Sequence, residues 1–131
     1  MAGEKNLDKL LKTMKPLLNP GSYVFCTTNN ISQFDFDDII LVFKEAEGYT
    51  LVIKKEVADC LQLHYDFVAA WITLTVHSAL DAVGLTAAFS RALAQENISC
   101  NVVAAYFHDH IFVAQQDAER AMGVLEELSK E

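Results

Sequence analysis

The stretch from Trp71 to Val113 constrains the fold of this chain more than any other part of the sequence. It reads as a strand, a glycine-containing loop, a helix, a second strand, a tight turn and a third strand. The helix is expected from Leu85 to about Glu96, because apolar residues recur at the spacing i, i+3, i+4, i+7 and i+8. These residues are Leu85, Ala88, Phe89, Ala92 and Leu93. An amphipathic helix between apolar strands is expected to cover one face of a sheet.

The elements around this helix extend the same pattern. A long strand is expected over Phe67 to Val76, with Ile72, Leu74 and Val76 pointing to one face. A hairpin of Ser99–Phe107 and Ile111–Gln115 is expected to turn at His108-Asp109-His110. Asp117 suits the cap of a last amphipathic helix, whose stripe is Ala118, Ala121, Met122, Leu125 and Leu128. The order β-α-β-β-α predicts an α+β, ferredoxin-like fold that lacks its final strand.

That missing strand leaves a sheet edge that must be covered. The segment Tyr23–Thr27 is rich in aromatic and β-branched residues and is one candidate for the edge strand, and a partner chain is the other. A partner chain at this edge would make the protein a homodimer or a higher homo-oligomer.

The first half of the chain resembles a shortened version of the second. Asn6 can cap a short helix, and Asn19-Pro20-Gly21 predicts a turn. A strand, a hairpin around Glu47-Gly48 and a short helix candidate follow. We therefore expect an N-terminal helix and turn over residues 1–20, a shortened half over 21–66 and a complete unit over 67–131.

Charge and composition restrict the function. The formal net charge is −8, and the first twenty residues carry four of the lysines. The rest of the chain is therefore strongly acidic, and neither nucleic acid nor an anionic membrane is expected as a partner. The N-terminus has no apolar core of a signal peptide and no apolar run is long enough to span a bilayer, which predicts a cytoplasmic protein. The three cysteines are far apart, and we expect them to be buried and reduced.

No group of residues in the sequence predicts catalysis or a cofactor. The acidic segment of residues 29–38 lacks the central glycine of a calcium loop. His77, His108 and His110 have no further ligand at metal spacing, so we expect no metal site. Ser78 follows His77 directly, but adjacent strand residues point to opposite faces and no GxSxG motif is present. The protein is therefore not expected to be an enzyme.

The segment GLTAAFSRALAQENISCNVVAAYFHDHIFVA resembles the ACT domain, a regulatory module of amino-acid metabolic enzymes. The resemblance rests on Gly84 before the helix, on Asn97-Ile98-Ser99-Cys100-Asn101-Val102 at the start of the next strand, and on the hairpin that follows. It is similar to a stand-alone bacterial group with two ACT-like halves, once known only as a domain of unknown function, and to the CASTOR arginine sensors and aspartate kinases. That group carries the pattern S-T-Y-x-T-D-Y-V-L-V, which Tyr106 and Asp109 match here. Ala104 and Ala105 replace its small hydroxyl residues, and His108 replaces its threonine.

The resemblance implies an amino-acid effector held between the His77–Thr86 loop of one ACT unit and the hairpin region of a neighbouring unit. The helix start after Gly84 favours a carboxylate, and Asp81 or Asp109 would pair with a cationic group. The expected ligand-binding residues are His77, Ser78, Asp81, Val83, Gly84, Leu85, Thr86, Ala105, Tyr106 and Asp109.

Simpler structural roles stay open for these residues. Gly84 is also typical of a turn, Asp109 of a hairpin turn bonded to its own backbone, and Asp81 of a solvated loop. A second hypothesis follows from the alanines at 104 and 105. They remove hydroxyls that could contact a ligand, and the second hypothesis is therefore a ligand-free structural or protein-interaction module that keeps the ACT fold.

Overall fold

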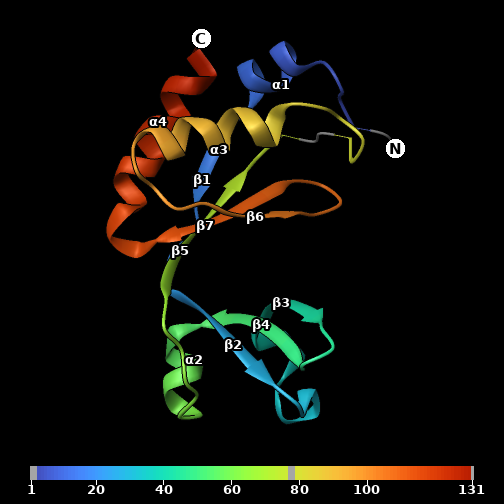
Figure 1. Ribbon diagram of the computed structural model, residues 1–131, viewed down its shortest axis with the longest axis vertical. Helices are drawn as coiled ribbons and strands as arrows, with labels where there is room; N and C mark the ends of the chain where they lie inside the picture. The colour runs from blue at the N-terminus through green and yellow to red at the C-terminus, as the bar shows by residue number, and fades with distance from the viewer. Residues whose placement is uncertain (1–2, 77–78, 131) are drawn as a thin grey trace. The chain divides into compact units, whose positions relative to one another are not determined.

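The computed structural model describes residues 3–76 and 79–130. The chain divides into two compact units, which are both visible in Figure 1. Unit 1 contains the described residues of Met1–Asn19 and of Ala70–Glu131, and unit 2 contains Pro20–Ala69. The two segments of unit 1 are thus separated in sequence by the whole of unit 2.

Unit 1 has three helices, four strands and a short 3-10 turn within its described residues. In chain order these are α1 (Leu7–Thr13), β1 (Pro16–Leu18), β5 (Val68–Leu74, in this unit from Ala70), α3 (Leu85–Gln95), β6 (Asn101–Ala104), β7 (Asp109–Ala114), η3 (Gln115–Asp117) and α4 (Ala118–Lys130). The strands are ordered β1-β5-β7-β6, and the β1–β5 and β6–β7 pairs are antiparallel. This arrangement confirms the predicted α+β, ferredoxin-like fold.

The missing edge strand of unit 1 comes from the N-terminal segment. Leu17 pairs with Thr73, and Pro16 and Leu18 pair with Leu74 and Ile72. The candidate Tyr23–Thr27 pairs with β5 only at Tyr23 and Val24, opposite Ala69 and Val68, and it does not fill the edge of unit 1. The sequence did not reveal β1, because it has only three residues and begins with proline. A sheet accepts proline at the first position of an edge strand.

The helices of unit 1 cover one face of its sheet around a single core. Asn6 caps α1 by accepting a hydrogen bond from the Lys9 amide, as its position predicted. The predicted stripe of α3 is confirmed, since Leu85, Phe89 and Leu93 are its buried residues. The fully buried side chains of this core are Leu10, Met14, Ile72, Leu74, Phe89, Leu93, Ile111, Val113, Ala121 and Leu125. Apolar burial of this kind is the main stabilising term of the unit.

Unit 2 has the same layout in shorter form. Its elements are β2 (Tyr23–Thr28), η1 (Ile31–Gln33), η2 (Phe36–Asp38), β3 (Ile39–Lys44), β4 (Tyr49–Lys54) and α2 (Lys55–Cys60), followed by the first two residues of β5. The strands are ordered β3-β4-β2, and Val68 and Ala69 of β5 pair with β2 on its other side. Two 3-10 turns therefore stand where unit 1 has its helix α3.

The cysteines differ in exposure. Cys26 is buried, Cys100 is half-buried and Cys60 is exposed at the end of α2, and all three are free thiols. The expectation that all three are buried was wrong for Cys60, because the buried residue of this short helix is Ala58. Of the helices in the described part of the chain, none combines the length and the apolar character that crossing a membrane requires.

Candidate functional site

The β6–β7 hairpin determines how Asp109 lies. The predicted turn at His108-Asp109-His110 was wrong, because the loop spans residues 105–108 and the Ala105 amide donates to the His108 carbonyl at 3.0 Å. Asp109 is therefore the first residue of β7 and pairs with Ala104 across the hairpin. Residues two apart share a strand face, so Asp109 lies on the same face as Ile111, which is fully buried in the core. The alternative of a hairpin-turn residue is excluded by this register.

A small cavity lies between this hairpin and the loop that leads into α3. Its volume is about 110 Å³. The lining residues are Ala79, Leu80, Ala82, Gly84, Leu85, Thr86, Ala104 and Asp109. Thr86 and Asp109 carry the polar side chains of this lining, and Asp109 contributes its carboxyl group.

Gly84 shapes the loop side of the cavity. It is the N-cap residue of α3 and has a φ of +102°, which L side chains rarely adopt. A Cβ atom at this position would lie 3.0 Å from Cδ2 of Leu7 on α1, so the glycine also makes room for that helix. With no side chain at the cap, the first turn of α3 receives no side-chain capping hydrogen bond, and its amide groups remain available to an anion.

Asp109 is the buried acidic residue in the wall of this cavity. The residue as a whole is only 6% exposed. Burial raises the pKa of its carboxyl group, and the charge of His108 opposes that rise. A buried carboxylate is costly unless a cation or hydrogen-bond donors compensate it. This residue therefore favours a cationic group in the cavity.

Comparison with protein families identifies both halves of the chain. The ACT domain matches residues 2–70 in one version and residues 67–127 in another. The chain belongs to the ACT domain family. ACT domains are regulatory modules, and the chain contains two of them, the second of which holds the cavity described above.

Solved structures agree with this assignment. A protein of unknown function from Vibrio cholerae, noted as a possible transport protein, is 47% identical over 95% of this chain and 97% of its own, with a TM-score of 0.86. A protein from Agrobacterium tumefaciens is 16% identical, with a TM-score of 0.72, over 88% of this chain and 89% of its own. The ligand-free regulatory subunit of aspartate kinase from Thermus thermophilus is 11% identical, with a TM-score of 0.60, over 90% of this chain and 98% of its own. The last two likenesses show the fold alone. No curated protein sequence matches the chain.

The structure brings together some of the predicted ligand-binding residues of the second ACT domain. Gly84, Leu85, Thr86 and Asp109 all line the cavity. His77 and Ser78 lie outside the described residues.

The remaining predicted residues do not line the cavity. Asp81 forms an ion pair of 2.9 Å with Lys5, and its side chain is 70% exposed. Val83 and Tyr106 are exposed, and Ala105 belongs to the hairpin loop. Asp109, and not Asp81, is thus the carboxyl group that this ACT cavity presents.

Sequence reasoning missed half of the lining residues. Ala79, Leu80 and Ala82 belong to the loop that had been identified, but they lack any chemical signature of their own. Ala104 was noticed only as a lost hydroxyl, whereas the register places it directly beside Asp109. The period-two pairing of a hairpin would have revealed this if the turn had been placed correctly.

The histidines near the cavity have structural partners. The Trp71 indole donates to Nδ1 of His110 at 3.0 Å, and burial lowers the pKa of His110. An Nδ1 that accepts this bond belongs to the neutral ring. The rings of His108 and His110 are 6.4 Å apart. Within residues 3–76 and 79–130, no three histidine, cysteine or acidic side chains gather in a way that could hold a metal ion.

Proposed function

We propose that the second ACT domain binds a small amino acid in the cavity beside Gly84 and that the protein acts as an amino-acid-responsive regulatory module. The observation that carries this proposal is Asp109, a buried carboxyl group in the wall of a cavity that also contains the start of α3. A ligand that brings an ammonium group would compensate the buried charge.

The cavity has a polar contact for each end of a zwitterion. The ammonium group pairs with Asp109, and the carboxylate receives hydrogen bonds from the first-turn amides of α3. The side chain lies against the apolar wall of Leu80, Ala82 and Ala104. A volume of about 110 Å³ is the space of roughly four water molecules, which suits glycine, alanine or serine and excludes arginine or phenylalanine.

Exposed apolar side chains near the cavity support its being covered by a neighbouring ACT domain of a second copy. Leu80 and Val83 on the loop, and Tyr106 and Phe107 on the hairpin, are all more than half exposed. Apolar groups gathered in this way are typical of a protein interface. A ligand enclosed at such an interface stabilises the assembly that binds it more tightly than the separate copies do. This shift in assembly would transmit the effector signal.

Isothermal titration calorimetry tests the proposal. The wild type is titrated with glycine, alanine, serine, arginine and phenylalanine, and heat is expected only from the first three. Asp109→Asn keeps the shape but removes the charge, so affinity should fall by about 10- to 100-fold, the loss of one charge-assisted hydrogen bond. Asp66→Asn, at an exposed carboxylate of unit 2, is the matched control and should bind as the wild type does. Absence of binding by any of the five amino acids, with no change in melting temperature, would overturn the proposal.

The size of the cavity favours one alternative, a ligand-free interaction module. Binding pockets for small molecules usually measure about 300–1,000 Å³, several times the volume found here. In this case the association of copies would be the same with and without amino acids. Size-exclusion chromatography across the five ligands separates the alternatives, because only the first proposal predicts a ligand-dependent elution volume.

A further inference from the structure

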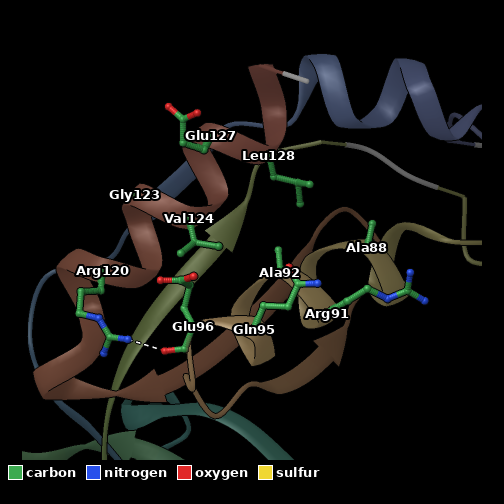
Figure 2. A pocket seen from close by; sticks show the side chains of 10 residues that line it. All are labelled: Ala88, Arg91, Ala92, Gln95, Glu96, Arg120, Gly123, Val124, Glu127 and Leu128. Atoms are coloured by element: carbon green, nitrogen blue, oxygen red, sulfur yellow. Dashed lines mark hydrogen bonds between the residues drawn. The ribbon is translucent and has the colours of Figure 1, made fainter.

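A second groove of unit 1 lies between α3 and α4, and it shares no lining residue with the cavity that contains Asp109. Its volume is about 630 Å³. Figure 2 shows Val124 and Leu128 of α4 on one side of this groove and Ala88 and Ala92 of α3 on the other. All four are half-buried apolar side chains, so the groove presents an apolar floor that the described chain leaves partly open.

Gly123 is the residue of this groove that the fold of a single chain does not explain. It lies in the middle of α4, where glycine weakens a helix relative to alanine. A Cβ atom added here would meet no atom within 4 Å, so no described neighbour requires the missing side chain. Close approach by something outside the chain is a physical reason for glycine at such a position.

The face of α4 that carries Gly123 is complementary to itself. Arg120, Gly123, Val124 and Glu127 lie at the spacing i, i+3, i+4 and i+7, and all four line the groove. A two-fold axis midway between Gly123 and Val124 would place a second α4 antiparallel to the first. Arg120 would then face Glu127 of the second copy, and Gly123 would face Val124 of the second copy. A symmetric interface requires this reciprocity of charge and size.

We propose that α4 is a self-association surface, at which a second copy of this chain docks antiparallel through Gly123 and Val124. Val124 fills the space above Gly123 of the other copy, and the apolar side chains of the groove are covered. The two Arg120–Glu127 pairs select the antiparallel register more than they add affinity, because both side chains are more than half exposed. Arg120 keeps donors for this pair beyond those it gives to Asp117 and the Glu96 carbonyl.

Charge reversal tests the surface. In Arg120→Glu two like-charge contacts replace the two attractive pairs, and the same holds for Glu127→Arg, so each variant alone should self-associate about 10-fold more weakly in sedimentation velocity. An equal mixture of the two variants should recover the wild-type association, because both mixed contacts are again of opposite charge. The double variant should recover it as well.

Two further variants keep the test decisive. Glu126→Lys changes charge at an exposed position of α4 outside the groove and should associate as the wild type does. Gly123→Lys should weaken self-association at least as much as Arg120→Glu does while its circular dichroism spectrum stays that of the wild type, since a Cβ atom at this position meets no atom within 4 Å. A wild type that stays monomeric, a Gly123→Lys variant that associates normally, or single variants that the mixture fails to rescue would each overturn the proposal.

Discussion

At the scale of single residues, Asp109 opposes stability in the unliganded protein. Its carboxyl group is buried beside apolar side chains, and burial raises its pKa. Because the folded-state pKa is raised above the unfolded one, the group favours folding only where it is protonated. That contribution is fully present below the unfolded pKa and is lost as the pH rises through the folded one. A binding residue is a common place for such a cost.

Replacing Asp109 by asparagine should therefore stabilise the unliganded protein near neutral pH. The gain is expected to be on the order of 1 kcal/mol in the free energy of unfolding, and it should vanish below the ordinary aspartate pKa of about 4. Urea unfolding of both proteins across this pH range measures the difference. A variant that is less stable than the wild type at neutral pH would show that the carboxylate has a stabilising partner.

The thiols provide a second prediction at this scale. Burial raises the pKa of Cys26, and it raises the pKa of Cys100 to about 11. Thiolate is the reactive form, so these two groups should react slowly with a disulfide reagent at neutral pH. Cys60 is exposed and should react fast. Titration of the native protein should count one rapid thiol, which Cys60→Ser removes, and titration in denaturant should count three.

At the scale of elements, periodicity determined what was predictable. The helices α3 and α4 were placed from their apolar stripes, because long amphipathic segments carry a strong signal. The strand β1 and the hairpin loop 105–108 were missed, because short elements are fixed by their partners and not by their own composition. The residues of the cavity were likewise predictable only in part. Its loop was identified, but the placement of Ala104 beside Asp109 depends on a register that the sequence does not reveal.

The junction before α3 should tolerate no side chain. In Gly84→Ala the new Cβ lies 3.0 Å from Leu7 Cδ2, and the positive φ disfavours any L residue. A loss of about 1–2 kcal/mol in the free energy of unfolding is expected, measured by chemical denaturation. Gly84→Ala combined with Leu7→Ala tests the contact, because the double variant should recover the steric part of the loss relative to Leu7→Ala alone.

The middle of α4 should behave in the opposite way. Gly123→Ala places a methyl group in open space within a helix, so the free energy of unfolding at monomer concentrations should rise by about 0.5–1 kcal/mol. Thermal unfolding at low protein concentration measures this gain. A loss of stability instead would mean that a contact within the chain requires the glycine.

At the scale of the whole molecule, unit 1 is built from both ends of the chain. The N-terminal segment supplies the edge strand β1 and two fully buried side chains of its core, Leu10 and Met14. Unit 2 is a continuous segment between them. Contacts between residues so distant in sequence close a large loop. The loss of chain entropy on folding is therefore larger for unit 1 than for unit 2. The domain boundary after residue 66 that was predicted from the sequence separates the expected elements. The core of unit 1, however, also contains side chains that lie before residue 20.

This dependence makes a prediction about distant residues. Leu10→Ala should lower the free energy of unfolding of unit 1 by about 2–5 kcal/mol, because it opens a cavity in a core shared with α3 and α4. Amide hydrogen exchange in Phe89–Leu93 and Ala121–Leu125 should therefore accelerate, although these residues lie far along the chain. Leu17→Ala is the matched control, since that side chain is 52% exposed and its loss should change stability by less than about 0.5 kcal/mol. If exchange in α3 and α4 were unaffected by Leu10→Ala, residues 67–131 would hold their core without the N-terminal helix, and the two ends of the chain would not share one folding unit.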